Sequence, residues 1–342
     1  MLSLTIDGDR WRSHLRSVAD ATPGIVPVAK GNGYGLGLAA LARRTDWLGA
    51  DTLAVGTYAE LPEVASRFAG DLVVLTPWRP WNGAPDAAHA SRVIHTVSRA
   101  EDLDALLAVA PGARVVLERM TSMRRHGMSA ADLWQTAELA LRSARVEGVT
   151  VHLPMQGGNE AEARRLLDDV IGAGLSTVWV SHLTPAELER LGSAYPDLTL
   201  RPRIGTGLWL GDRGALTVSA LVQDVHPITK GDSFGYRGGH GLSGHLLVVS
   251  GGTAHGLGLT SPSGDNSPRG RLTVAAKGLV EAVGTLRSPF SLDGRALEFA
   301  EPPHMQASML HLPTGARVPE VGESVAVSVR FTTTSFDVVE FA

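Results

Sequence analysis

Between about residues 22 and 212, short apolar runs of β type alternate with longer segments whose apolar residues have helical spacing. Such alternation is typical of βαβ units, in which helices connect parallel strands. Amphipathic segments at 160–173 and 185–194 lie between the later runs, with Thr184 as a helix N-cap. Eight runs have strand composition: residues 25–29, 53–56, 72–75, 93–96, 115–118, 149–152, 177–180 and 198–201. The pattern predicts an α/β fold with a closed (β/α)8 barrel of the TIM type.

The composition and periodicity of the sequence change after residue 212. Glycine, threonine and valine dominate, helical periodicity ends, and residues 246–250 and 324–331 have the composition of antiparallel strands. Residues 264–271 form a polar segment that we interpret as a loop. A chain of 342 residues exceeds one average domain. We therefore expect a barrel over residues 1–215 and a C-terminal, mainly antiparallel β domain over residues 216–342.

Composition excludes several classes of protein. The net charge of −4 and the absence of Lys/Arg runs give no basic surface for nucleic acid. The chain has no cysteine, which excludes disulfides, thiolate metal sites and a cysteine nucleophile. The histidines have no compact ligand spacing, so no metal is expected. No apolar run reaches the ~20 residues of a membrane helix, and the start lacks a signal-peptide pattern, so we expect a cytoplasmic protein without membrane contact.

Lys30 follows the first predicted barrel strand and opens a glycine-rich segment, residues 30–37. Active sites of such barrels lie at the C-terminal ends of the strands. An adjacent apolar strand partly desolvates the amine, which disfavours its charged form and makes it available for a Schiff base. The alternative is a solvated lysine in a glycine-rich turn. The spacing alone does not decide between the two.

Five segments, in order along the chain, carry a more specific signal. They are residues 28–37 around the lysine, 123–127 (MRRHG), His152 at a strand end, 203–209 (RIGTGLW) and 230–236 (KGDSFGY). This series resembles the alanine racemases, which are fold type III enzymes that use pyridoxal 5′-phosphate. The resemblance extends over most of the chain and implies an amino-acid racemase.

The resemblance implies two opposed bases. Lys30 would bind the cofactor and then act on one face of the substrate α-carbon, while Tyr236 would act on the other, because racemisation needs a proton to leave from one side and return from the opposite side. The pKa of a tyrosine phenol is normally about 10 and must be lowered for this task, so cationic neighbours are expected, with His152 and Arg203 as candidates. Without its sequence context, Tyr236 would instead be a residue of the core or rim.

Further cofactor contacts follow from the resemblance. Arg203 would face the pyridine nitrogen and keep it unprotonated, which suppresses side reactions such as transamination; the alternative is a surface arginine. Gly205 and Thr206 would offer backbone amides to the phosphate at a helix N-terminus. Tyr34 would add its hydroxyl to the same phosphate, and the ring of His152 would stack on the cofactor. Either Ser181 or His182 would contribute after the seventh strand.

Substrate contacts are implied at Arg125 and Met305, the latter through its backbone amide. Many alanine racemases have a carbamylated lysine seven residues before the motif arginine, where this chain has Glu118. A glutamate carries the same charge, so we hypothesise an Arg125–Glu118 pair.

Other differences from the pattern of the alanine racemases lie in the β domain. His304 stands where the family often has cysteine, residues 252–258 replace a tyrosine-containing loop, and residues around 334–336 replace a C-terminal tyrosine. Alanine itself is therefore not fixed as the substrate by the resemblance.

Three functional hypotheses remain at this stage. The first is a racemase that acts as a homodimer with shared active sites, in which the partner's β domain supplies Tyr236. The second is a protein that binds pyridoxal phosphate with little turnover. The third is another fold type III enzyme, such as a decarboxylase or aldolase; those decarboxylases commonly use a cysteine acid, which this chain lacks.

Overall fold

The computed structural model describes residues 1–83, 86–155, 157–236, 238–258 and 286–342. The chain forms two compact units, one of residues 12–211 and one of residues 1–11 together with 212–342. The first residues group with the second unit because strand β1 (Leu2–Ile6) pairs with strands of the β domain, whereas the sequence placed them in the barrel range. The polar segment 264–271 lies outside the described residues.

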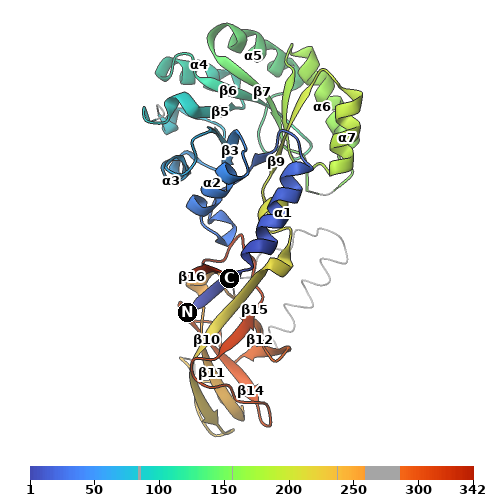
Figure 1. Cartoon of the computed structure of the whole chain (residues 1–342). Coiled ribbons are helices and arrows are strands. Elements are labelled where there is room, and N and C mark those ends of the chain that lie inside the picture. Colours follow the sequence, from blue (N-terminus) through green and yellow to red (C-terminus); the bar gives the residue numbers. More distant parts are fainter. Residues whose placement is uncertain (84–85, 156, 237, 259–285) are drawn as a thin grey trace. The chain divides into compact units, whose positions relative to one another are not determined.

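The unit of residues 12–211 is a closed parallel barrel, which confirms the expected fold (Figure 1). Its strands follow chain order around the ring, and β2 meets β9 where Val26 pairs with Arg203. A parallel bridge between Val28 and Ala54 joins the end of β2 to β3. The strands are β2 (Val26–Pro27), β3 (Thr52–Val55), β4 (Asp71–Val74), β5 (Val93–Val97), β6 (Arg114–Arg119), β7 (Arg145–Val151), β8 (Thr177–Val180) and β9 (Thr199–Ile204). All eight predicted strands are confirmed within a few residues, and β2 is the shortest of them.

Helices surround this barrel (Figure 1). Helix α7 begins and ends where the sequence predicted, and the Thr184 hydroxyl accepts a hydrogen bond from the backbone N–H of Glu187, as expected of an N-cap. Within the described residues, every helix is too short to cross a membrane. The helices are α1 (Gly8–Asp20), α2 (Leu38–Trp47), α3 (Leu61–Ala65), α4 (Ala100–Val109), α5 (Ala130–Ser143), α6 (Glu160–Gly172), α7 (Pro185–Ala194) and the short α8 (Thr206–Trp209).

Two apolar layers stabilise the barrel. The helices pack on the outer faces of the strands through a large cluster that includes Leu117, Leu133 and Leu166. The barrel interior is filled by a smaller cluster: Val26, Val28, Ala54, Val73, Ile94, Val116 and Trp179. Because the interior is packed with side chains, ligands can bind only at its ends.

The other unit is a mainly antiparallel β domain, also as predicted. Its strands are β1, β10 (Leu216–Ile228), β11 (Gly244–Ser250), β12 (Leu286–Leu292), β13 (Arg295–Phe299), β14 (Ala307–Pro313), β15 (Ser324–Val327) and β16 (Val338–Phe341). Strand β10 is long because it pairs with β1 and β15 along its first half and with β11 beyond an irregularity at Val222–Asp224.

One predicted strand of this domain is too long. Residues 324–331 were expected to be extended, but β15 ends at Val327. The reason lies at Arg330, whose carbonyl accepts a hydrogen bond from the N–H of Thr333 and others from the hydroxyls of Thr333 and Thr334. These bonds turn the chain away from the sheet.

Candidate active site

Lys30 lies at the C-terminal end of β2, on the segment that begins after the buried Val28 and Ala29. The Glu60 carboxylate fixes this segment. It accepts a hydrogen bond from the N–H of Gly31 at 2.9 Å and another from the N–H of Gly56, after β3, at 2.6 Å. One side chain thus ties together the loops that follow two adjacent barrel strands.

Lys30 is an exposed residue, but the barrel atoms around its amine still exclude part of the hydration of that group. Its pKa is lowered by this desolvation first, and then by the positive charges of Arg125 and Arg203, against the opposing effect of Glu60. The neutral amine is the form that attacks a carbonyl. The prediction that Lys30 is partly desolvated is therefore consistent with the structure.

A polar chain leads from β9 to β7 across the same end of the barrel. Arg203 donates to the carbonyl oxygen of Val151 at 2.9 Å, and its Nη2 lies 3.5 Å from the Ser181 hydroxyl. Ser181 is buried and lies 2.6 Å from Nδ1 of His152. Burial, with smaller effects from Arg203 and Arg125, lowers the pKa of His152 to about 3. The imidazole is therefore neutral, and the expectation that His152 acts as a cationic neighbour is wrong; positive charge comes from the arginines.

Glu118 is a buried carboxyl and Arg203 is a partly buried arginine, and each has unused hydrogen-bonding capacity. Within the described chain, Nε of Arg203 and Oε2 of Glu118 have no hydrogen-bond partner. Burial lowers the pKa of Arg203 to about 10, although Glu118 opposes this shift. Burial also raises the pKa of Glu118 to about 7, opposed first by Arg203, then by Arg125 and Arg79.

The hypothesised Arg125–Glu118 ion pair is not formed. Arg125 is exposed on the segment after β6, whereas Glu118 is 6% exposed and Arg203 is the charge with the largest effect on it. The segment that carries Arg125 is closed by two backbone bonds, from Met120 N–H to the Met128 carbonyl and from Met128 N–H to the Glu118 carbonyl.

Tyr34 and Gly205 form a tight contact at the start of α8. Tyr34 is 5% exposed, and burial raises the pKa of its phenol to about 12, so that the hydroxyl keeps its proton. A Cβ built on Gly205 would collide with the Tyr34 hydroxyl oxygen and would lie 3.4 Å from Cβ of Val28. Only glycine allows the backbone to lie this close to the phenol. Thr206 follows as the first residue of α8.

Two of the predicted site residues lie in the β domain. Tyr236 and Met305 are 88% and 72% exposed. The backbone N–H of Tyr236 donates to Oε2 of Glu301 at 3.0 Å, and the ring of His304 lies 4.7 Å from the Tyr236 ring between centroids. Glu301 and Glu60 were not among the predicted site residues. The spacing of Thr57 and Glu60 matches a capping box and could have indicated the latter.

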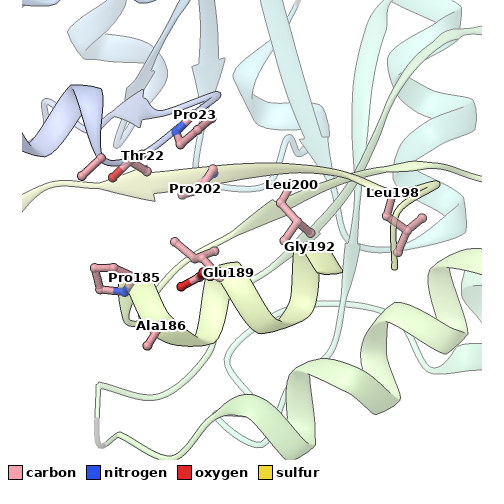
Figure 2. Close-up of a pocket in the computed structure, with 11 residues that line it drawn as sticks. Thr22, Pro23, Pro185, Ala186, Glu189, Gly192, Leu198, Leu200 and Pro202 are labelled. Atoms are coloured by element: carbon pink, nitrogen blue, oxygen red, sulfur yellow. The ribbon is translucent and has the colours of Figure 1, made fainter. Parts of the chain in front are cut away.

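An apolar groove lies apart from these residues, between α7 and β9 (Figure 2). Its volume is about 560 Å³. Pro185 and Ala186 of the helix line it together with Leu200 and Pro202 of the strand. None of the predicted site residues lines this groove.

Both the sequence and the fold of the chain are similar to those of known proteins. Residues 6–171 match the family described as alanine racemase, N-terminal domain. The alanine racemase of Nitratidesulfovibrio vulgaris is 27% identical over 259 residues, which cover 66% of this chain and 67% of that protein.

Solved structures share the fold. Alanine racemase from E. faecalis superposes with a TM-score of 0.72 at 18% identity, covering 100% of this chain and 98% of that one. The enzyme from Bartonella henselae, solved with covalently bound pyridoxal phosphate, gives a TM-score of 0.72 at 17% identity, with 100% and 99% covered. Residues 6–171 are therefore similar to the N-terminal domain of alanine racemases, and the chain as a whole shares the fold of these enzymes.

Proposed function

We propose that this protein is a pyridoxal phosphate-dependent amino-acid racemase that interconverts L- and D-amino acids with Lys30 and Tyr236 as opposed bases. The observation that carries the proposal is the environment of Lys30. Its pKa is lowered, it lies at the C-terminal mouth of the barrel, and Arg203, His152 and Ser181 are linked by contacts at the same end. The similarity of residues 6–171 to the alanine racemase N-terminal domain and the cofactor bound to the Bartonella enzyme add support.

The residues at the barrel mouth fit such a cofactor. Nε of Arg203 is a buried donor without a partner, and a pyridine nitrogen is an acceptor that would satisfy it. The protonated Tyr34 hydroxyl and the backbone amides of Gly205 and Thr206 would hold the phosphate, and Ser181 would contribute to the same site. When bound, the cofactor supplies an electron-withdrawing ring that acidifies the substrate α-C–H bond.

The chain's own residues would then direct the protons. Lys30 would remove or return the α-proton on one face, since its lowered pKa makes the neutral amine accessible. Tyr236 would serve the other face. Arg125, a fixed positive charge at the barrel mouth, and the backbone amide of Met305 would bind the substrate. His152, neutral at physiological pH, would pack against the ring without adding charge.

We further propose a cytoplasmic homodimer, in which the β domain of each subunit completes the site of the other. The exposure of Tyr236 and Met305 supports this arrangement, because both side chains are available to a second subunit. Light scattering of the purified protein tests it, and a monomer that racemises at full rate would contradict it.

A visible absorption spectrum followed by borohydride reduction and peptide mapping tests the cofactor. The sequence contains three lysines, Lys30, Lys230 and Lys277, so the labelled site is read without ambiguity. We expect a yellow protein whose reduced adduct lies on Lys30. The Lys30→Ala variant should lose both colour and adduct, whereas the control Lys230→Ala should keep them.

Racemisation is then measured as the loss of optical rotation with a panel of L-amino acids. A protein that carries the adduct but racemises none of them would be a cofactor-binding protein and not a racemase. A colourless protein that gains no adduct from added pyridoxal phosphate would overturn the proposal altogether.

A further inference from the structure

The segment that carries Tyr236 is held in place although the side chain is exposed. Phe234 and Gly239 exchange two backbone hydrogen bonds, of 2.9 and 2.8 Å, and so close a turn around the tyrosine. The Tyr236 N–H donates to Oε2 of Glu301 at 3.0 Å. The backbone around Tyr236 is thus held both by the Phe234–Gly239 hydrogen bonds and by the hydrogen bond to Glu301.

Glu301 also fixes the side-chain neighbour of the tyrosine. Its carboxylate is buried, with the residue 8% exposed, and its second oxygen, Oε1, lies 2.5 Å from Nε2 of His304. The His304 ring packs against the Tyr236 ring at 4.7 Å between centroids and an angle of 49°. One buried carboxylate therefore orients both the backbone of Tyr236 and the ring that supports its phenol.

Gly235 adds an independent sign that this contact is built into the fold. Its φ is +69°, and a Cβ at this position would collide with the Glu301 carboxylate. A side chain here would be strained by the backbone conformation and excluded by the space. The chain thus presents bare backbone to Glu301 immediately before the tyrosine.

His304 is itself anchored. Its backbone N–H donates to the Ala307 carbonyl at 2.9 Å, and its backbone carbonyl accepts a hydrogen bond from the Thr253 N–H at 2.8 Å. Because the backbone of His304 is fixed and its imidazole is hydrogen-bonded to Glu301, the ring has little freedom to rotate. It can therefore restrict the phenol it contacts.

We propose that Glu301 and His304 are positioning residues for the catalytic Tyr236. Glu301 holds the tyrosine backbone and orients the imidazole, and the imidazole holds the phenol in one orientation. This inference rests on the proposed function, in which Tyr236 is one of two bases. It predicts a selective defect, because loss of the support impairs proton transfer on the Tyr236 face and leaves the Lys30 face intact.

Exchange of the α-proton in D₂O, followed by NMR for each enantiomer separately, measures the two faces independently. Tyr236→Phe serves as the reference and should exchange only the enantiomer that presents its proton to Lys30. For His304→Ala and Glu301→Ala we expect racemisation and exchange on the tyrosine face to fall by about ten- to a hundredfold, the range expected for a displaced catalytic group. Exchange on the lysine face should be retained.

Matched controls separate positioning from general damage. Glu301→Gln keeps an acceptor for the Tyr236 N–H and a polar contact to His304, so it should recover most of the activity lost in Glu301→Ala. His240→Ala, in an exposed position on the same segment, should leave both exchange rates unchanged. His304 is partly exposed, so its alanine variant decides the matter even where Glu301→Ala fails to fold.

The outcomes distinguish the two levels of the proposal. Equal losses on both faces, or unchanged rates in both alanine variants, would overturn the positioning role while the racemase remains. A wild-type protein that racemises no amino acid and exchanges no α-proton would overturn the proposed function, and the role of Glu301 and His304 with it.

Discussion

Replacement of the buried Glu118 by glutamine should stabilise the protein at pH 8 and have much less effect at pH 5. Burial raises the pKa of this carboxyl from 4.5 to about 7. The folded protein therefore binds more protons than the unfolded chain between these two values. By linkage, the stabilisation is complete below the lower value and is lost as the pH rises through the upper one. Glutamine is neutral at every pH in this range, so the variant does not lose stability in this way as the pH rises.

The magnitude follows from the shift. A difference of about 2.5 pKa units corresponds to about 3 kcal/mol at full ionisation, and between pH 5 and pH 8 about 2 to 3 kcal/mol of it is expressed. For a chain of 342 residues, the entropy of unfolding is about 0.7 kcal/mol per degree, so the stability gap between variant and wild type should widen by about 3 to 4 °C over this range.

Thermal unfolding of the cofactor-loaded protein, scanned from pH 5 to pH 8, measures the gap directly. Glu298→Gln is the matched control, since Glu298 is exposed on β13 and its substitution removes the same charge without removing a buried one. The gap for the control should be small and nearly independent of pH. A Glu118→Gln gap that stays constant over the range would refute the conclusion that this carboxyl is buried with a raised pKa.

Three further predictions concern stability in the barrel. Gly205→Ala should destabilise the protein by about 1 to 3 kcal/mol through overpacking against the Tyr34 hydroxyl; denaturant unfolding of the double variant with Tyr34→Phe should recover part of the loss, and no recovery would show that the collision lies elsewhere. Asp102 is 1% exposed and pairs with Arg79 at 2.8 Å, so Asp102→Asn should cost about 3 to 5 kcal/mol in urea unfolding, and a loss within error of zero would contradict this. Burial lowers the pKa of His95 from 6.5 to about 4, so the wild type should lose stability as the pH falls from 6.5 to 4, and His95→Gln should lose less; equal pH profiles of the two proteins would count against a buried neutral imidazole.

The fold could be predicted because its signal is local and repeated. The segment at 177–180 and the helix at 185–194 have the predicted bounds, since a four-residue apolar strand and a capped amphipathic helix are fully specified by neighbouring residues. The strand that was predicted to reach residue 331 failed because a carbonyl at Arg330 is used by a turn. β propensity alone does not reveal such competition.

The candidate site was predicted less completely, and the reason is electrostatic. The sequence identified Lys30 and Arg203 through motif order, but it assigned Glu118 to Arg125 by spacing along the chain. In the structure, burial of Glu118 and the position of Arg203 decide the interaction. Burial depends on the packing of several strands and cannot be inferred from a separation of seven residues. Glu301 escaped notice for a similar reason, because it is 65 residues distant from Tyr236 in sequence.

The charges at the barrel mouth favour the binding of an anionic ligand. Arg125 and Arg203 lower the pKa values of both Lys30 and His152, so the unliganded site disfavours additional positive charge. The carboxylate with the largest effect on Arg203 is Glu118, which is itself only partly ionised near neutrality because its pKa is about 7. An uncompensated cluster of this kind is stabilised by binding an anion. A phosphate and a substrate carboxylate would both offset the repulsion between the positive charges at this end of the barrel.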